Sequence, residues 1–385
     1  MAPRGQEADN DLGDVMSGAG SARRVVINAQ GFDALIAALA GEGREVFGPV
    51  RRDGAVVYEE VSSSADFPKG WIDEQSGGHY RLRQEGEAYF GATLGPQGWK
   101  RILHPPKQRL WRTEGAGEET RIIPEPLDET RRAFIGARSC DLAAIAVQDR
   151  VLTEGPYRDP HYAARRENLF IVAVNCTRAA DTCFCVSMDT GPKASKGYDI
   201  ALTELDGGRF LAEAGSGAGQ ALLAALPSQP SSAGDEAEAE AGIDRARDQQ
   251  RAIDTEGLPA LLKSRPDHPR WSEVAQRCLN CANCTMVCPT CFCTTVDEVT
   301  SLDGPETERV NNWASCFTVD FSHVHGGAVR PGAKSRYRQW MTHKLATWVD
   351  QFDEMGCVGC GRCISWCPVG IDITEEAAAL RKEGG

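Results

Sequence analysis

The chain has 385 residues, of which 41% are hydrophobic, 25% are charged and 15 are cysteine, and its formal net charge at pH 7 is −13. This length allows two or more domains with substantial cores. The negative charge disfavours general nucleic-acid binding, which needs a basic face, and no apolar stretch reaches the roughly 18 residues of a membrane helix. The N-terminus lacks the apolar segment of a secretory signal. We therefore expect a cytoplasmic protein whose cysteines serve metal or redox chemistry rather than disulfides.

Residues 1–21 predict a disordered tail, and residues 22–226 predict one domain of mixed α/β type. The domain opens with a short strand, and a helix over Phe32–Ala40 follows, because its apolar side chains recur at helical spacing. Near the end of the domain, Asp206-Gly-Gly separates two segments of strand character, and this turn sequence predicts a hairpin.

A strand–helix–strand unit is predicted in the middle of this domain. Its parts are a strand at Ala133–Ala137, an amphipathic helix at Leu142–Leu152 and an apolar strand at Asn168–Asn175. A right-handed crossover makes the two strands parallel, so their carboxyl ends lie at the same edge of the sheet. Open α/β sheets bind their ligands at that edge.

Four cysteines follow the ends of these two strands. Cys140 and Cys176 come directly after the strands, and Cys183 and Cys185 come a few residues later. Four thiolates at one edge suffice to ligate a 4Fe–4S cluster, so we predict one here, in addition to the two clusters described below. A zinc site and a set of buried, unreactive cysteines are the alternatives.

Residues 227–242 are rich in Pro, Ser, Gly and acidic residues and contain almost nothing to bury, so they predict a flexible linker. Beyond the linker, residues 243–385 predict a second domain that contains several helices. Helices are expected over Ile243–Ile253, Leu258–Lys263, Trp271–Leu279 and Arg336–Phe352. The last of these is amphipathic and leads into a run of cysteines.

Eight cysteines of the second domain form two copies of the spacing C-x2-C-x2-C-x3-C, each followed by proline. Bacterial ferredoxins ligate 4Fe–4S clusters with this run, and the fourth cysteine of each run ligates the other cluster. The proline turns that fourth cysteine away, because it restricts the backbone of the residue before it. The alternative is that one run holds a purely structural metal. We predict two 4Fe–4S clusters, the first held by Cys278, Cys281, Cys284 and Cys367 and the second by Cys357, Cys360, Cys363 and Cys288.

Residues 289–356 separate the two runs, a much longer gap than in compact bacterial ferredoxins. The gap shows helical patterns rather than strands. We therefore expect an all-helical dicluster ferredoxin domain over residues 243–385. The predicted fold class is a mixed α/β N-terminal domain followed by this all-helical domain.

Three further cysteines, Cys291, Cys293 and Cys316, lie between the runs, with His323 and His325 downstream. They are candidates for an additional metal site, since three cysteines and a histidine can bind zinc. The alternatives are that they line a cluster pocket or pack as small hydrophobic residues. No Gly-rich dinucleotide fingerprint follows a strand, and no Walker loop occurs. Partners must therefore supply and accept the electrons that this chain carries.

Several segments together resemble the β subunit of cytoplasmic sulfhydrogenases, which are nickel–iron hydrogenases that couple hydrogen to NAD(P). The same segments resemble the related iron–sulfur subunit of anaerobic sulfite reductase. The resemblance covers about residues 23–376. It rests on residues 136–145 (GARSCDLAAI), 175–176 (NC), 182–188 (TCFCVSM), 288–293 (CPTCFC), 315–317 (SCF), 325–327 (HGG) and 357–372 (CVGCGRCISWCPVGID).

The resemblance to sulfhydrogenases implies a complex of four subunits. A large subunit holds the nickel–iron centre, a small subunit holds further clusters, and a flavin subunit meets NAD(P)H. This chain would relay electrons between the small and flavin subunits, as an electron-transfer subunit of an oxidoreductase. Three alternatives stay open: the iron–sulfur subunit of an anaerobic sulfite reductase, a non-enzymatic iron–sulfur sensor or scaffold, and direct disulfide chemistry by Cys291, Cys293 or Cys316.

Overall fold

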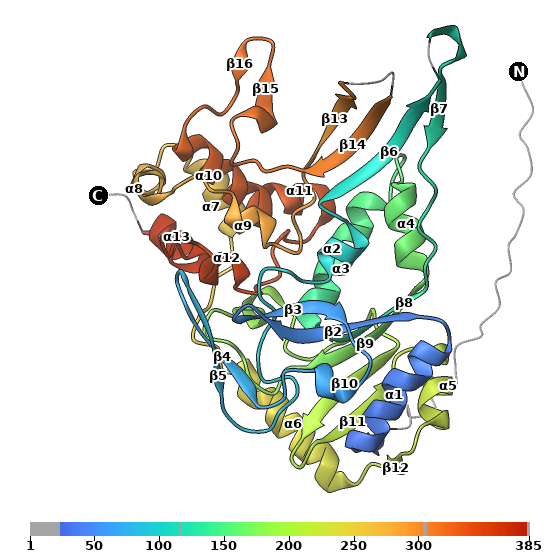
Figure 1. Cartoon of the computed structure of the whole chain (residues 1–385). Coiled ribbons are helices and arrows are strands. Elements are labelled where there is room, and N and C mark those ends of the chain that lie inside the picture. The colour runs from blue at the N-terminus through green and yellow to red at the C-terminus, as the bar shows by residue number, and fades with distance from the viewer. Residues whose placement is uncertain (1–23, 116, 303–305, 383–385) are drawn as a thin grey trace, which may run out of the picture.

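The structure of this chain is a computed structural model, which describes residues 24–115, 117–302 and 306–382. The predicted tail, residues 1–21, lies outside these ranges. Figure 1 shows the orange-to-red C-terminal half above and most of the blue-to-green N-terminal half below, except for a teal segment over residues 107–124 that reaches up beside the C-terminal half. Within the described residues, no helix is both long and apolar enough to cross a membrane.

The N-terminal half is built on an eight-stranded sheet. Its strands are β1 (Val25–Ile27), β2 (Glu45–Arg52), β3 (Ala55–Glu60), β8 (Arg132–Arg138), β9 (Leu169–Asn175), β10 (Ile200–Leu205), β11 (Arg209–Ala214) and β12 (Gln229–Pro230). Their order is β12-β1-β11-β10-β9-β8-β2-β3. The neighbours β2, β8, β9 and β10 pair in parallel, and the outer strands pair antiparallel. The predicted parallel pair and the predicted hairpin are both confirmed.

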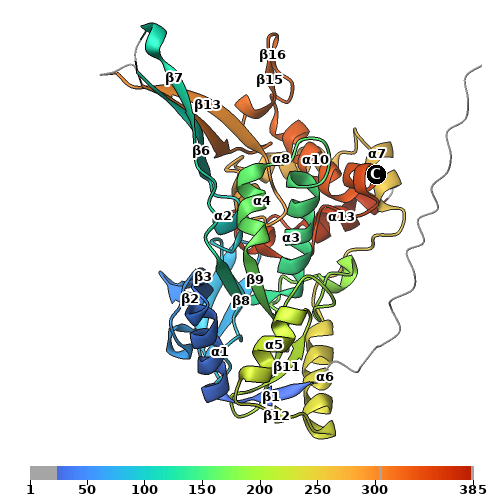
Figure 2. The same cartoon turned by 90° about the vertical axis from the view of Figure 1, so that its right-hand side faces the viewer.

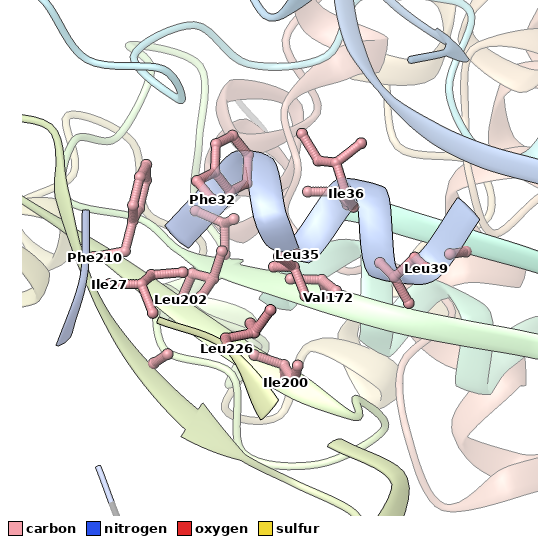
Figure 3. Packing of buried hydrophobic residues seen from close by; sticks show 14 of the residues in the cluster. Ile27, Phe32, Leu35, Ile36, Leu39, Val172, Ile200, Leu202, Phe210 and Leu226 are labelled. Carbon is pink, nitrogen blue, oxygen red and sulfur yellow. The ribbon is translucent and has the colours of Figure 1, made fainter. Parts of the chain in front are cut away.

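Helices cover both faces of this sheet. They are α1 (Ala29–Gly41), α3 (Ser139–Leu152), α4 (Pro160–Glu167), α5 (Gly217–Ala225) and α6 (Ala233–Arg247). Successive side chains of a strand point to opposite faces, so Val172 of β9 packs with α1 and α5, whereas Ile171 packs with α3 and α4. Figure 3 shows the α1 side, where Leu35 and Leu39 face the sheet.

A second sheet joins the two halves of the chain. It contains β6 (Lys107–Glu114) and β7 (Arg121–Pro124) from the N-terminal half, and β13 (Thr294–Thr300) and β14 (Thr307–Trp313) from the C-terminal half, in the order β13-β14-β6-β7. Figure 2 shows these strands extending together from the body of the molecule.

The prediction of an all-helical C-terminal domain is therefore wrong. Besides β13 and β14, this half contains a small hairpin of β15 (His323–Val324) and β16 (Gly327–Ala328). β14 pairs antiparallel with β6, which lies far away in the sequence. Pairing of this kind depends on the partner strand, and a local pattern of apolar residues does not reveal it.

The remainder of the C-terminal half consists of short helices around a separate apolar core. They are α7 (Leu258–Ser264), α8 (Arg270–Arg277), α9 (Asn283–Met286), α10 (Ala333–Thr342), a π-helical turn (His343–Thr347), α11 (Trp348–Phe352), α12 (Arg362–Ser365) and α13 (Ile373–Arg381). The predicted helix over Arg336–Phe352 is confirmed as α10, the π turn and α11 in succession. Phe184 of the N-terminal half packs into this core, so the halves share buried surface. The division into two domains stays a prediction.

The predicted flexible linker, residues 227–242, is folded instead. β12 pairs with β1, and the Ser232 hydroxyl caps the N-terminus of α6. Arg209 forms ion pairs with Asp235 and Glu238 of this helix, and Ala239 is buried against the sheet. A helix of alanine, glycine and acidic residues can be stable with little buried apolar area when an N-cap and ion pairs stabilise it. Of the helix predicted over Ile243–Ile253, only residues 243–247 are helical, as the end of α6, and residues 248–253 are not helical.

A further hairpin, β4 (Trp71–Ser76) with β5 (His79–Gln84), reaches from the N-terminal half to the second cysteine run. A short helix, α2 (Lys100–Leu103), lies elsewhere, beside α3 and α4 (Figure 1). The Gly78 amide at the hairpin tip donates to the Ile364 carbonyl at 3.0 Å. A Cβ atom on Gly78 would lie 2.7 Å from the Cys367 carbonyl oxygen. Only glycine allows this approach, and the contact holds the fourth cysteine of the run in place.

Candidate metal centres

The first predicted set of cysteines lines one cavity. The cavity is surrounded by Cys278, Cys281, Cys284 and Cys367, with Phe317, Tyr337 and Trp340 beside them. Backbone amides donate to two of the sulfurs, from Asn280 to Cys278 Sγ at 3.4 Å and from Ile371 to Cys367 Sγ at 3.3 Å. Hydrogen bonds to sulfur of this kind tune iron–sulfur clusters. The structure thus brings Cys367 to the first run, as crossed ligation requires, and its role as a ligand stays a prediction.

The two cysteine runs share one backbone geometry. In each run, the residues on both sides of the second cysteine are in the left-handed region: Asn280 and Ala282 in the first, Gly359 and Gly361 in the second. These conformations reverse the chain between successive cysteines, which lets three side chains face the same space. The first run has room for side chains at these two positions. In the second run, a side chain at either position would collide with neighbouring backbone, so glycine is required.

The second set of cysteines gathers around Cys288. Cys288 is close enough to Cys357, Cys360 and Cys363 to affect the pKa of each thiol. The buried Lys344 Nζ lies 3.3 Å from Cys288 Sγ. The pKa of Cys288 is held well below its usual range, because Cys291 donates a hydrogen bond to it and Lys344 lies beside it. The structure therefore also brings together the second predicted set.

The chemistry of both sets fits an iron–sulfur cluster. Every cysteine in the described residues is a free thiol. Burial, together with the charges of neighbouring cysteines, raises the pKa of Cys284 and Cys363 well above the usual range and that of Cys357 to about 12. Thiolates crowded away from water need a cationic centre to stay deprotonated, and iron supplies that charge.

The third predicted set lines a single cavity at the carboxyl edge of the large sheet. Cys140 lies in the first turn of α3, Cys176 follows β9, and Cys183 and Cys185 lie in the next loop; all four surround this cavity. Arg138 Nη1 lies 3.5 Å from Cys176 Sγ. Burial raises the pKa of Cys140 and Cys183 well above the usual range and that of Cys185 to about 11. The donor set fits a 4Fe–4S cluster as the first two do.

The second site lies between the other two. Cys363 also lines the first cavity, and Cys360 also lines the third. Between the second and third sites, Arg362 Nη2 forms a buried ion pair with Asp141 Oδ1 at 2.8 Å. The two halves also touch through their backbones here, since the Phe184 amide donates to the Gly359 carbonyl at 2.8 Å.

Replacing Gly361 by alanine tests the close approach of the second cysteine run to Thr182 in the N-terminal half. Gly361 has φ +74°, and a Cβ atom on it would overlap the Thr182 carbonyl. We expect the variant to lose about 2–4 kcal/mol of unfolding free energy, from the left-handed conformation and the overlap together. The measurement is anaerobic denaturant unfolding. Gly207→Ala is the matched control, because Gly207 has φ +73° and no neighbour within 4 Å. Equal losses in both variants would show that the contact contributes nothing.

The three remaining cysteines lie beside the second site. Lys344 influences the pKa of Cys291, Cys293 and Cys316 alike, whereas His323 and His325 are exposed, in and next to the β15–β16 hairpin. Across residues 24–115, 117–302 and 306–382, no three His, Cys, Asp or Glu side chains are arranged to hold a single metal ion. An additional metal site at these cysteines stays a prediction.

Buried charged residues around the sites were missed from the sequence. Lys344, Arg362, Arg138 and Asp141 are all at least nine-tenths buried. One signal for Lys344 was present. It follows Trp340 by four positions and precedes Trp348 by four, so helical spacing puts it on the apolar face.

These features define a class of protein, an iron–sulfur protein with paired cluster sites. A family model described as a 4Fe–4S dicluster domain matches residues 277–371, which span both cysteine runs. The chain therefore carries two 4Fe–4S clusters in this region.

The whole chain is also similar to a known protein. It is 30% identical over 370 residues to sulfhydrogenase 2 subunit beta of Pyrococcus furiosus, and the match covers 94% of this chain and 99% of that protein. The chain belongs to the family of sulfhydrogenase β subunits, and it is an iron–sulfur electron-transfer subunit. No solved structure matches it.

Proposed function

We propose that this chain relays electrons within a nickel–iron hydrogenase, between the small subunit of the hydrogenase and a flavin subunit that binds NAD(P). The related protein is a sulfhydrogenase subunit by name, which supports a hydrogenase complex as the setting. The chain itself provides no catalytic residues in this proposal. It holds, orders and insulates the electron carriers.

The observation that carries the proposal is the adjoining arrangement of three cysteine sites. We assign the first cluster to Cys278, Cys281, Cys284 and Cys367, the second to Cys357, Cys360, Cys363 and Cys288, and a third to Cys140, Cys176, Cys183 and Cys185. A bound 4Fe–4S cluster takes up and releases one electron at a time. Cys363 of the second set also lines the first cavity, and Cys360 of the second set also lines the third. Successive sites therefore adjoin each other directly.

Two surfaces next to the sites are accessible to partners. Near the first site, Cys281 is exposed, and Leu279 and Val369 beside it are exposed apolar residues. Near the third site, a cleft of about 850 Å³ lies along α3 and is lined in part by Gly191, which packs against Cys185. These two surfaces support contacts with two different subunits.

The test is anaerobic purification of the full chain from its native source, with iron analysis and identification of the proteins that accompany it. The proposal expects large, small and flavin subunits, the large one with a nickel–iron centre, and about twelve iron atoms on this chain, four for each cluster. Isolation with a sirohaem protein would assign the chain to a sulfite reductase instead. Isolation without any redox subunit would contradict the relay and favour a sensor or scaffold.

A further inference from the structure

Two buried lysines converge on the loop that carries Cys288. Lys344 is 5% exposed, and its Nζ lies 3.3 Å from Cys288 Sγ and 2.9 Å from Thr290 Oγ1. Lys100 is 7% exposed, and its Nζ donates to the carbonyl oxygens of Cys288 at 3.1 Å and Cys291 at 3.0 Å. Burying one ammonium group is expensive unless negative charge or hydrogen-bond acceptors surround it. Two buried ammonium groups at one loop therefore need a physical explanation.

The two lysines face different parts of the loop. Lys100 donates to main-chain carbonyls, and its Nζ lies 3.8 Å from the centre of the Trp313 ring, a cation–π contact. Cys291 and Cys288 also lie near its charge. Lys344 contacts the sulfur itself, and Cys291 and Cys357 also lie near its charge. The anionic partner of Lys344 is therefore the group of cysteines at the second site.

A cation at this position acts on the redox equilibrium of whatever the cysteines hold. Reduction adds one negative charge to a cluster, and a nearby positive charge and an N–H···S hydrogen bond both stabilise the reduced state. In the first site, by contrast, the sulfurs of Cys278 and Cys367 accept from the backbone amides of Asn280 and Ile371. A backbone amide carries no net charge, so its effect is smaller. The buried Arg336 lies near Cys278, but its guanidinium donates to the carbonyls of Phe317 and Pro331 rather than to sulfur.

We infer that Lys344 is a positioning residue that raises the reduction potential of the cluster at the second site, acting through Cys288. This rests on the proposed cluster assignment, and it adds a specific role for the buried ammonium. Since the second site lies between the other two, Lys344 sets how readily an electron enters the middle of the relay.

The experiment replaces Lys344 by methionine in the full chain, with Lys344→Arg and Lys344→Gln beside it. Each protein is titrated anaerobically with reductant while the spectroscopic signal of each cluster is followed, and iron is counted. For Lys344→Met we expect at least a tenfold fall in the ratio of reduced to oxidised second cluster at fixed ambient potential, which equals about 59 mV for a one-electron couple. The first cluster should titrate as in the unmodified chain. In Lys344→Arg the second cluster should keep a potential close to that of the unmodified chain, because arginine keeps the positive charge.

Lys100→Met is the matched control. It removes the other buried ammonium from the same loop, but Lys100 contacts carbonyl oxygens rather than sulfur, so we expect a smaller shift of the second cluster. An equal or larger shift in Lys100→Met would overturn the specific role of Lys344.

The outcomes separate this inference from the function on which it rests. An unchanged second potential in Lys344→Met, with iron retained, overturns the inference and leaves the cluster assignment intact. A second cluster missing from the unmodified chain overturns both. If Lys344→Met loses its second cluster, the comparison of Lys344→Arg with Lys344→Gln decides: a lower potential in the glutamine variant supports the role of charge, and equal potentials overturn it.

Discussion

Replacing Cys288 by serine should remove the cluster of the second cysteine run, although Cys288 belongs to the first run in sequence. The structure brings Cys288 beside Cys357, Cys360 and Cys363. We expect a loss of about four iron atoms and of the second cluster's spectroscopic signal. The first cluster should remain. The measurement is iron analysis with low-temperature spectroscopy of the anaerobically purified variant.

The matched control is Cys367→Ser, because Cys367 belongs to the second run in sequence but is assigned to the first cluster. Cys367 lines the first cavity with Cys278, Cys281 and Cys284, so its loss should remove the first cluster and spare the second. If Cys288→Ser instead destroyed the cluster at Cys278, ligation would be uncrossed and each run would hold its own cluster.

The largest effect on function is expected for Cys140→Ala. Cys140 lies at the base of α3 and lines one cavity with Cys176, Cys183 and Cys185. Its loss should remove about four of about twelve iron atoms while the two C-terminal clusters remain. In the assembled complex, electron transfer between hydrogen and NAD(P) should fall by at least about 100-fold, because the tunnelling path would lose one of the cofactors that carry the electron. Reduction of an artificial dye by hydrogen should persist.

A suitable control is Cys316→Ala, which changes a cysteine beside the second site and leaves the third cavity untouched. Its iron content at the third site should be unchanged. Should Cys140→Ala keep its full iron content, the four N-terminal cysteines would be core residues rather than ligands. Loss of both hydrogen-dependent activities would indicate a structural role for the site in the complex.

Crossed ligation illustrates what spacing can predict. The three-residue intervals within each run are local, so they indicate that the first three cysteines of a run can surround one cluster without reference to the fold. The crossing of the fourth cysteine was predicted from the ferredoxin pattern and stays a prediction. A local pattern was equally informative for the strand–helix–strand unit around Cys140, where apolar periodicity and the right-handed crossover rule predicted a shared sheet edge. The structure indeed places Cys140 and Cys176 at one cavity.

Long-range contacts escaped prediction for a common reason. The segment of β13 and β14 was predicted to be helical, because β14 pairs with β6, which belongs to the other half of the chain. The acidic segment around Asp235 was predicted to be a flexible linker, because the ion pair that stabilises it comes from Arg209 on a different element. In both cases the stabilising interaction is absent from the local sequence window.

The sequence by itself determined the kind of cofactor and the ligand candidates, since these follow from residue chemistry at short spacing. Only the tertiary structure decided how the sites adjoin. Gly359 and Gly361 of the second run pack on the loop of Cys183, which brings the second and third sites together. The tertiary structure alone revealed the charge buried at Lys344 beside Cys288. Ligand type is a property of single residues, whereas adjacency and burial depend on segments that meet only after the chain has folded.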